Sequence, residues 1–182
     1  MDKHSTVAVI GAGTMGAGIA QVAATAGHRT FLHANRPGAA QQAKEHLAVT
    51  LEKLVAKGKL ERPAADAILG NITPVQDIAE LRDSDLVIEA IVEDLQAKKG
   101  LFKALEAVVS AECVLATNTS SLPVTAVAAA CQHPQRVIGL HFFNPAPLMP
   151  LVEVVPGLVT TPGLAEQCAE LMRAWRKSPV VC

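Results

Sequence analysis

The sequence predicts an α/β fold with a doubly wound, mostly parallel sheet and helices on both of its faces. Short runs of valine, leucine and isoleucine alternate along the chain with longer segments of helical periodicity. Such runs are typical of parallel strands that are buried on both faces. The chain has 182 residues, half of them hydrophobic, which is enough for one well-buried domain. We therefore expect a single domain over residues 1–182.

The first half begins with a strand, a helix and a second strand. Residues 6–10 form an apolar run that ends in glycine, which favours a buried strand. The helical segment 14–26 stops before Gly27, a residue typical of helix ends. The segment 29–33 is expected to form the second strand.

Two helices are expected next. Pro37 opens a long helix that reaches about Lys57 and ends at Gly58, because proline is favoured in the first turn of a helix. A shorter helix, 63–69, and a small edge strand, 71–73, complete this half.

The second half repeats the alternation. Residues 85–90 predict a central strand, and 95–109 predict an amphipathic helix with one apolar stripe. The remaining strands are expected at 113–117, 136–141 and 151–155, and the remaining helices at 124–131 and from Thr161 or Pro162 to Trp175.

Composition argues against several classes of function. A formal net charge of −1 gives no general attraction to nucleic acid or to an anionic membrane. No apolar run reaches the roughly 18 residues needed to span a bilayer. The start, Met1–His4, has no signal-peptide pattern, so a cytoplasmic protein is expected. The cysteines form no metal-binding pattern and are expected to be isolated buried thiols. They are Cys113, Cys131, Cys168 and Cys182.

A glycine-rich turn predicts a dinucleotide site of the Rossmann type. It follows a predicted strand and opens a predicted helix, which is the context that this fingerprint requires. The first glycine allows a sharp turn, the second lets the backbone approach a pyrophosphate, and the third permits close helix packing. The alternative is that the glycines serve helix packing alone. The turn consists of Gly11, Ala12, Gly13, Thr14, Met15 and Gly16.

The residue expected to bind the adenosine ribose is missing. Nicotinamide-binding folds of this type usually place Asp or Glu about 20 residues after the turn. Here the second strand ends in Ala34, Asn35 and Arg36. Asn35 can hydrogen-bond a ribose 2′-hydroxyl, and Arg36 can pair with a 2′-phosphate. We therefore expect NAD to be bound with some loss of discrimination against NADP.

Two residues point to proton transfer. His141 ends a predicted strand, and Glu153 lies twelve positions later in another apolar run. Imidazole exchanges protons near neutral pH, and a carboxylate in an apolar run needs a partner. We expect the fold to bring the two side chains together. From the residues alone, a structural histidine and a solvent-facing glutamate on an edge strand are the alternatives.

With these motifs in place, the chain resembles the N-terminal, NAD-binding domain of the 3-hydroxyacyl-CoA dehydrogenase family, including its 3-hydroxybutyryl-CoA dehydrogenase members. The resemblance implies reversible oxidation of an L-3-hydroxyacyl-CoA to the 3-ketoacyl-CoA, with NAD as hydride acceptor. The segment HFFNP followed by VEVV is far more specific than the glycine turn. The matching segments are 7–21, 85–94, 117–122, 136–147 and 151–155.

The resemblance also implies roles for individual residues. His141 is the general base, and Glu153 orients it. Ser120 and Asn144 contact the substrate oxygen and the nicotinamide, where they stabilise developing charge. The alternative for Ser120 is a cap for the helix expected near Val124.

Charged residues near the cofactor and coenzyme A follow from the same resemblance. Glu93 and Lys98 match cofactor-binding positions, although a surface pair at helical spacing is the alternative. Lys53, Lys57 and Lys59 match a region that reaches toward the phosphates of coenzyme A, with a solvated helix face as the alternative. No metal site is expected.

The family continues beyond Lys177 into an all-helical domain that closes the substrate cleft and forms a homodimer. The present sequence stops at Cys182. We therefore expect the chain alone to bind the cofactor and to be weakly active. The alternative functions are a dehydrogenase of a non-thioester hydroxy acid, similar to L-gulonate or crystallin-like dehydrogenases, and a non-catalytic nucleotide-binding domain. Fatty-acid β-oxidation, aromatic-compound degradation and butanoate metabolism all use this chemistry, and the sequence does not choose among them.

Overall fold

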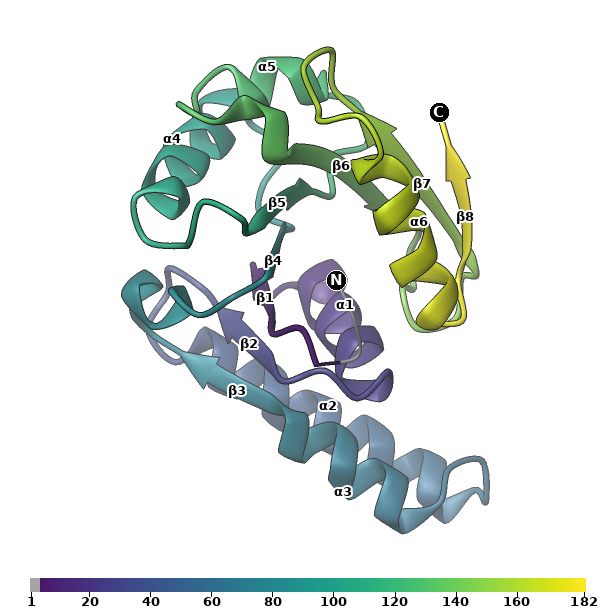
Figure 1. Cartoon of the computed structure of the whole chain (residues 1–182). Helices are drawn as coiled ribbons and strands as arrows, with labels where there is room; N and C mark the ends of the chain where they lie inside the picture. The colour runs from purple at the N-terminus through teal and green to yellow at the C-terminus, as the bar shows by residue number, and fades with distance from the viewer. Residues whose placement is uncertain (1–3) are drawn as a thin grey trace.

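The computed structural model describes residues 4–182, and most of the Met1–His4 start lies outside the described residues. Helices and strands alternate along the chain as expected (Figure 1). The strands are β1 (Val7–Ile10), β2 (Thr30–His33), β3 (Ile72–Val75), β4 (Leu86–Glu89), β5 (Val114–Thr117), β6 (Val137–Phe142), β7 (Leu151–Pro156) and β8 (Ser178–Val181). The helices are α1 (Thr14–Thr25), α2 (Ala39–Ala56), α3 (Arg62–Asn71), α4 (Leu95–Glu106), α5 (Val124–Ala128) and α6 (Leu164–Ala174), with short 3-10 turns η1 (Ile78–Leu81) and η2 (Pro134–Arg136).

The strands form one eight-stranded sheet in the order β3-β2-β1-β4-β5-β6-β7-β8. Strands β1 to β6 pair in parallel, β7 is antiparallel to β6, and β8 is parallel to β7. The chain builds outward from β1 in one direction and from β4 in the other. The predicted doubly wound, mostly parallel sheet is therefore confirmed, and its switch point lies between β1 and β4.

Helices cover both faces of the sheet, as predicted. On one face, α1, α2, α3 and α6 pack on side chains such as Val9, Ile88 and Leu140. On the other face, α4 and α5 pack on alternate residues of the same strands, including Ile10 and Leu115. Because the parallel strands are buried on both faces, they read in the sequence as continuous apolar runs.

Two helices begin later than expected, because a glycine in the left-handed region of φ precedes each of them. The long helix begins at Ala39 rather than Pro37, because Gly38 has φ 74°. The last helix begins at Leu164 rather than Thr161 or Pro162, because Gly163 has φ 87°. Residues with positive φ cannot continue a right-handed helix, so each glycine marks the boundary.

Two helices end earlier than expected. Helix α5 ends at Ala128 rather than Cys131, and the next residues turn toward α4. The carboxylate of Glu106 accepts hydrogen bonds there from Gln132 N at 2.6 Å and His133 N at 2.8 Å. The amphipathic helix itself ends at Glu106 rather than Val109.

The sequence did not predict β8, and this strand changes the place of Glu153. Strand β8 pairs with β7 along its outer side, so β7 is an inner strand. The edge-strand alternative for Glu153 is therefore wrong.

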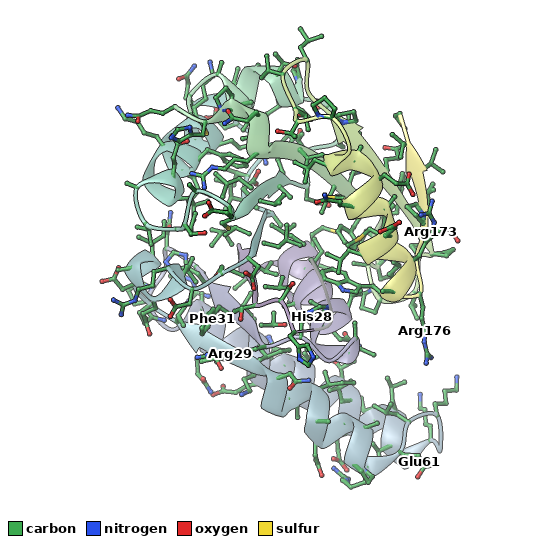
Figure 2. The ribbon with its side chains drawn as sticks, in the orientation of Figure 1. His28, Arg29, Phe31, Glu61, Arg173 and Arg176 are labelled. Carbon is green, nitrogen blue, oxygen red and sulfur yellow. The ribbon has the colours of Figure 1, made fainter. Side chains whose placement is uncertain are left out.

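Helices α2 and α3 lie side by side, and their far ends extend beyond the sheet as an arm (Figure 1). Glu61 lies at the far end of this arm, while Arg29 stacks on Phe31 near the sheet, 4.8 Å from the ring centroid (Figure 2). Among residues 4–182, no helix is long and apolar enough to cross a membrane.

Candidate active site at the carboxyl edge of the sheet

Most of the expected site residues lie at or just beyond the carboxyl ends of the parallel strands. Gly11 N donates to His33 O at 2.8 Å, which joins the ends of β1 and β2. Asn118 N donates to Glu89 O at 2.8 Å, which joins the ends of β5 and β4. Open α/β sheets bind ligands at this edge, beside the switch point.

The glycine turn has the geometry of a phosphate-binding loop. Gly11 has φ 113°, and an added Cβ would lie 2.4 Å from Ala90 O. A Cβ on Gly16 would lie 1.7 Å from Gly11 O, so this glycine is needed for packing. Gly13 instead faces open space and begins α1 with no side-chain cap. Backbone N–H groups at this helix end therefore stay available for a pyrophosphate, which fits a dinucleotide.

The other members of the turn have different exposure. Thr14 is exposed, whereas Ala12 and Met15 are half-buried and pack against the core. The turn as a whole thus rests on the sheet and presents Gly13 and Thr14 outward.

The residues that follow β2, where a ribose-binding acid was expected, include no carboxylate. Ala34 is half-buried, and Asn35 and Arg36 are exposed. The Arg36 guanidinium donates to Gln42 Oε1 at 2.9 Å, which holds it over the start of α2. Two carboxylates whose charges act on His33 at the end of β2, those of Asp77 and Glu80, are engaged in a capping box at η1.

His141 and Glu153 face each other across β6 and β7, where they are directly paired in the antiparallel register. His141 Nδ1 lies 2.8 Å from Glu153 Oε2. The side chains are 18% and 37% exposed, so the pair is accessible but partly sheltered. Because a carboxylate only accepts, it favours the tautomer with the proton on Nδ1 and leaves Nε2 free to take a proton.

The segment after His141 is fixed by hydrogen bonds to two residues that were not expected at the site, Asn118 and Lys177. Phe142 N donates to Asn118 Oδ1 at 2.8 Å, so Asn118 ties the end of β6 to the end of β5. Lys177 Nζ donates to Ala146 O at 2.6 Å and to Met149 O at 2.9 Å. Burial lowers the pKa of Lys177. Asn144 lies between these anchors with an exposed side chain.

Glu93 binds the loop that carries Ser120. Its Oε1 atom accepts from the Thr119 hydroxyl and from Ser120 N at 3.1 Å. It also accepts from the N–H and hydroxyl of Ser121 at 3.3 and 3.2 Å. Burial alone would raise the pKa of Glu93, but these hydrogen bonds and the charge of Lys98 lower it to about 2. The helix cap near Ser120 is Pro123, so the capping alternative for Ser120 is wrong.

Lys98 is not a surface residue. Its side chain is 1% exposed and lies 2.6 Å from Glu89 Oε1 and 3.2 Å from Glu93 Oε2. The surface-pair alternative is therefore wrong. Glu89, fully buried at the end of β4, was not among the expected site residues. The signal was present, because a carboxylate closing an apolar strand requires a buried partner.

The lysines assigned to coenzyme A are far along the arm. Lys53 lies in the last turn of α2, Lys57 caps that helix, and Lys59 follows; all three are exposed. Their position is compatible with the phosphate-binding interpretation and with the solvated-face alternative.

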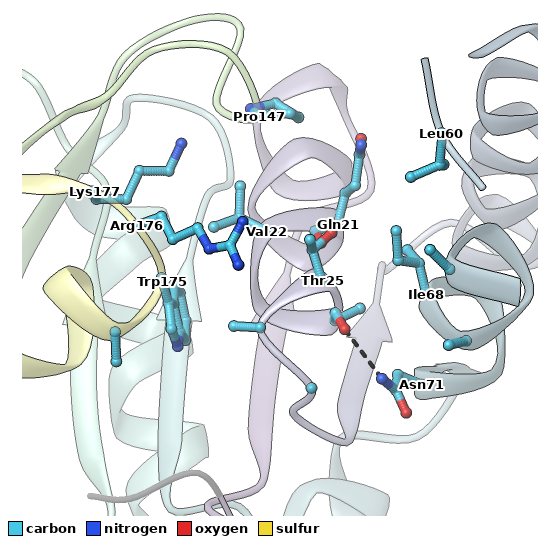
Figure 3. Close-up of a pocket in the computed structure, with 16 residues that line it drawn as sticks. Gln21, Val22, Thr25, Leu60, Ile68, Asn71, Pro147, Trp175, Arg176 and Lys177 are labelled. Atoms are coloured by element: carbon cyan, nitrogen blue, oxygen red, sulfur yellow. Dashed lines mark hydrogen bonds between the residues drawn. The ribbon is translucent and has the colours of Figure 1, made fainter. Parts of the chain in front are cut away.

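A cleft of about 710 Å³ opens elsewhere, between α1, α3 and the end of α6 (Figure 3). Arg176 reaches from the end of α6 toward α1 at one side, and Asn71 bonds to Ala24 O at 3.0 Å at the other (Figure 3). None of the expected site residues lines this cleft.

The described residues contain no group of three or more metal-binding side chains. The cysteines are free, and burial raises the pKa of Cys113 and Cys168 to about 12. The expectation of buried thiols is wrong for Cys182, which is exposed, and only partly met by Cys131.

Comparisons with known proteins bear on the whole chain. Residues 6–182 match the family model described as 3-hydroxyacyl-CoA dehydrogenase, NAD binding domain. The chain is 49% identical over 182 residues to 3-hydroxyadipyl-CoA dehydrogenase of Escherichia coli (strain K12), covering 100% of this chain and 38% of that protein. It is 42% identical over 174 residues to 3-hydroxybutyryl-CoA dehydrogenase of Clostridioides difficile, covering 96% of this chain and 62% of that protein.

A solved structure agrees with these sequence matches. The crystal structure of 3-hydroxybutyryl-CoA dehydrogenase from Escherichia coli K12 superposes with a TM-score of 0.96 at 49% identity. The match covers 98% of this chain and 38% of that chain. The chain thus spans about 38% to 62% of the length of these curated relatives.

Proposed function

Because this chain belongs to the family of NAD-binding domains of 3-hydroxyacyl-CoA dehydrogenases, we propose that it supplies cofactor binding and proton transfer for reversible oxidation of an L-3-hydroxyacyl-CoA to the 3-ketoacyl-CoA. The relatives named above act on coenzyme A thioesters by their names. NAD is the cofactor of the family, and when bound it accepts the hydride. The observation that carries the proposal is the direct pairing of His141 with Glu153 at the carboxyl edge of the sheet.

In this proposal each site residue has one task. His141 Nε2 takes the proton from the substrate hydroxyl, and Glu153 holds the ring and stabilises its protonated form. Ser120 and Asn144 donate hydrogen bonds that stabilise charge on the substrate oxygen. The glycine turn binds the pyrophosphate through backbone N–H groups.

Glu93 and Lys98 contribute to the cofactor side of the site. Lys98 Nζ lies 3.2 Å from Glu93 Oε2. Glu93 also accepts a hydrogen bond from Ser120 N in the segment 118–122, which we call the Ser120 loop. We assign them to shaping the nicotinamide end of the crevice. Lys53 and Lys57 are assigned to the coenzyme A phosphates, since exposed ammonium groups attract anions.

The cofactor preference is proposed to be relaxed. Asn35 takes the place of the acid that normally binds the ribose 2′-hydroxyl, and Arg36 offers a partner to a 2′-phosphate. We therefore expect NADH to be bound with some loss of discrimination against NADPH. An affinity for NADPH far below that for NADH would contradict this part of the proposal.

The setting of the reaction is proposed from the family as well. We place the activity in the metabolism of coenzyme A thioesters, of which fatty-acid β-oxidation is one setting, and in the cytoplasm. The relatives are longer than the matched region, and a homodimer is expected where the family's helical domain accompanies this one. The isolated 182-residue chain is expected to bind NADH and to turn over slowly.

The test is a comparison of the wild-type chain with His141→Gln. NADH oxidation is followed with acetoacetyl-CoA, and with acetoacetate as the non-thioester control. We expect slow turnover of the thioester that falls by about 10² to 10⁴ in His141→Gln, with unchanged NADH affinity. Equal turnover by His141→Gln and the wild-type chain would rule out His141 as the general base. Faster use of acetoacetate would favour the non-thioester dehydrogenase. Wild-type turnover at a typical enzyme rate of about 10 s⁻¹ would contradict the expectation of weak activity.

A further inference from the structure

Glu89 is a fully buried carboxylate at the centre of the sheet. Its side chain is 0% exposed, and it closes β4 beside the switch point. Thr117 Oγ1 donates to its Oε2 at 2.7 Å, and Ile91 N donates to its Oε1 at 2.7 Å. Burial of a charged group costs several kcal/mol unless it is paired and hydrogen-bonded, and here both oxygens are engaged.

Lys98 lies between Glu89 and Glu93. Its ammonium is held 2.6 Å from Glu89 Oε1 and lies 3.2 Å from Glu93 Oε2. Glu93 in turn accepts hydrogen bonds from the N–H groups of Ser120 and Ser121. An unbroken series of polar contacts thus joins β4, α4 and the Ser120 loop.

We propose that Glu89 is a positioning residue, which sets the Ser120 loop through Lys98 and Glu93. Glu89 is anchored on two sides by neighbouring backbone and strand, so it is the fixed point of the series. The Lys98 side chain is buried, so the position of its ammonium is set by the carboxylates of Glu89 and Glu93. The inference rests on the proposed function, in which Ser120 contacts the substrate.

Stability alone does not account for such an arrangement. A buried ion network can often be replaced by apolar side chains at little cost in stability, whereas removing one partner leaves an uncompensated charge. Two buried ions and the more exposed Glu93 provide a fixed geometry. Removing the charge of Glu89 is therefore expected to loosen the Ser120 loop, in addition to lowering the free energy of unfolding.

The same helix provides a matched control. At the other end of α4, Glu106 pairs with Arg136 at 3.4 Å and accepts hydrogen bonds from Gln132 N and His133 N. It also binds a loop through a sheltered carboxylate, with 10% exposure, but that loop carries no proposed site residue. Glu106→Gln should therefore cost stability without changing the Ser120 loop.

The first measurement is amide hydrogen exchange in the 182-residue chain, compared among wild type, Glu89→Gln and Glu106→Gln. We expect exchange of the Ser120 and Ser121 amides to rise by about tenfold in Glu89→Gln, while the amides of Gln132 and His133 keep their rates. Glu106→Gln should show the reverse. Unchanged exchange at Ser120 and Ser121 in folded Glu89→Gln would overturn the inference.

The second measurement is a double-mutant cycle on NADH affinity. If Glu89 acts through Glu93, then Glu89→Gln combined with Glu93→Gln should weaken NADH binding no further than Glu93→Gln alone. Additive losses would show that the two residues act independently and would overturn the inference. If the wild-type chain binds no NADH, the cofactor part of the proposed function fails, and the exchange rates still decide the role of Glu89.

A second variant covers the case in which Glu89→Gln does not fold. Thr117→Val removes the hydrogen bond to Glu89 Oε2 and also the acceptor for Thr119 N at 3.3 Å, and it leaves all three ions in place. The measurement is therefore made at Ser120 and Ser121, whose N–H groups donate to Glu93 and not to Thr117. We expect a smaller rise in exchange at Ser120 and Ser121, by about threefold, in a folded protein. No rise in this variant, with Glu89→Gln unfolded, would assign Glu89 a purely structural role.

Discussion

His141 and Glu153 are opposite residues of one antiparallel strand pair, and they are joined by a 2.8 Å contact between Nδ1 and Oε2. The register of β6 and β7 thus fixes which carboxylate meets the imidazole. A shift of one residue would turn Glu153 to the other face of the sheet. The pairing of two inner strands therefore defines the proposed proton-transfer dyad.

The dyad predicts that Glu153→Gln lowers turnover without weakening cofactor binding. The amide keeps the size of the side chain but removes the charge that stabilises the protonated imidazole. We expect NADH oxidation with acetoacetyl-CoA to slow by about 100-fold and NADH affinity to stay the same. The control is Glu166→Gln, because Glu166 forms an exposed pair with Arg173 at 2.8 Å. If Glu153→Gln turned over like this control, the carboxylate would have no part in the reaction.

In the glycine turn, Gly13→Ala and Gly16→Ala are expected to have different effects: the first on NADH affinity and the second on stability. A Cβ on Gly13 meets nothing within 4 Å, so Gly13→Ala should fold with wild-type stability. The methyl group would instead occupy the space where the backbone approaches the pyrophosphate, and NADH affinity should fall by at least about tenfold. Titration of NADH and thermal unfolding measure the two effects separately.

Gly16→Ala should behave in the reverse way. Its Cβ would lie 1.7 Å from Gly11 O, so α1 would have to move away from β1. We expect a loss of stability of about 2 kcal/mol or more. Wild-type NADH affinity in Gly13→Ala would favour the alternative that the glycines serve packing alone.

Cofactor preference should respond to the end of β2. Ala34→Asp restores the acid that is missing there, and the carboxylate would accept from a ribose 2′-hydroxyl and repel a 2′-phosphate. We expect NADPH binding to weaken by about tenfold and NADH binding to tighten. Arg36→Ala should weaken NADPH binding alone. Side-by-side titrations measure both, and equal responses of the two cofactors to Arg36→Ala would show that Arg36 does not contact the phosphate.

Glu93 should stabilise the fold only where it is ionised. Its folded pKa of about 2 lies below the ordinary value of 4.5, so the stabilisation is present above about pH 4.5 and is lost as the pH falls toward 2. The side chain is 37% exposed, and solvent screening limits the effect to about 1 kcal/mol. Denaturant unfolding of wild type and Glu93→Gln should therefore differ most at pH 7 and converge near pH 2. A difference that stays constant with pH would mean that the charge contributes nothing.

The sequence was sufficient for those parts of the fold and site that depend on local pattern. Buried parallel strands are apolar on both faces, so the residues of β1, β4 and β5 could be recognised without their partners. The pairing of His141 with Glu153 was also predictable, because a carboxylate in an apolar run needs a partner.

Features that depend on distant partners could not be predicted. Strand β8 contains Pro179 and mostly exposed residues, and only its pairing with β7 makes it a strand. The burial of Lys98 depends on Glu89, nine residues earlier on another element. Long charged side chains look alike in a sequence whether they face water or an ion partner, so the network was missed.

The backbone conformation of Arg176 predicts that its replacement by glycine stabilises the fold. Its φ of 59° lies in the left-handed region, where side chains other than glycine are strained by about 1 to 2 kcal/mol. Glycine removes this strain but raises the entropy of the unfolded chain by about 0.4 to 1 kcal/mol. We therefore expect Arg176→Gly to stabilise the fold by about 0.5 to 1 kcal/mol, which corresponds to a rise in Tm of about 1 to 4 °C. Arg176→Ala keeps the strain and should leave Tm unchanged, so an equal rise in both variants would show that the side chain, rather than the backbone, is the source of the effect.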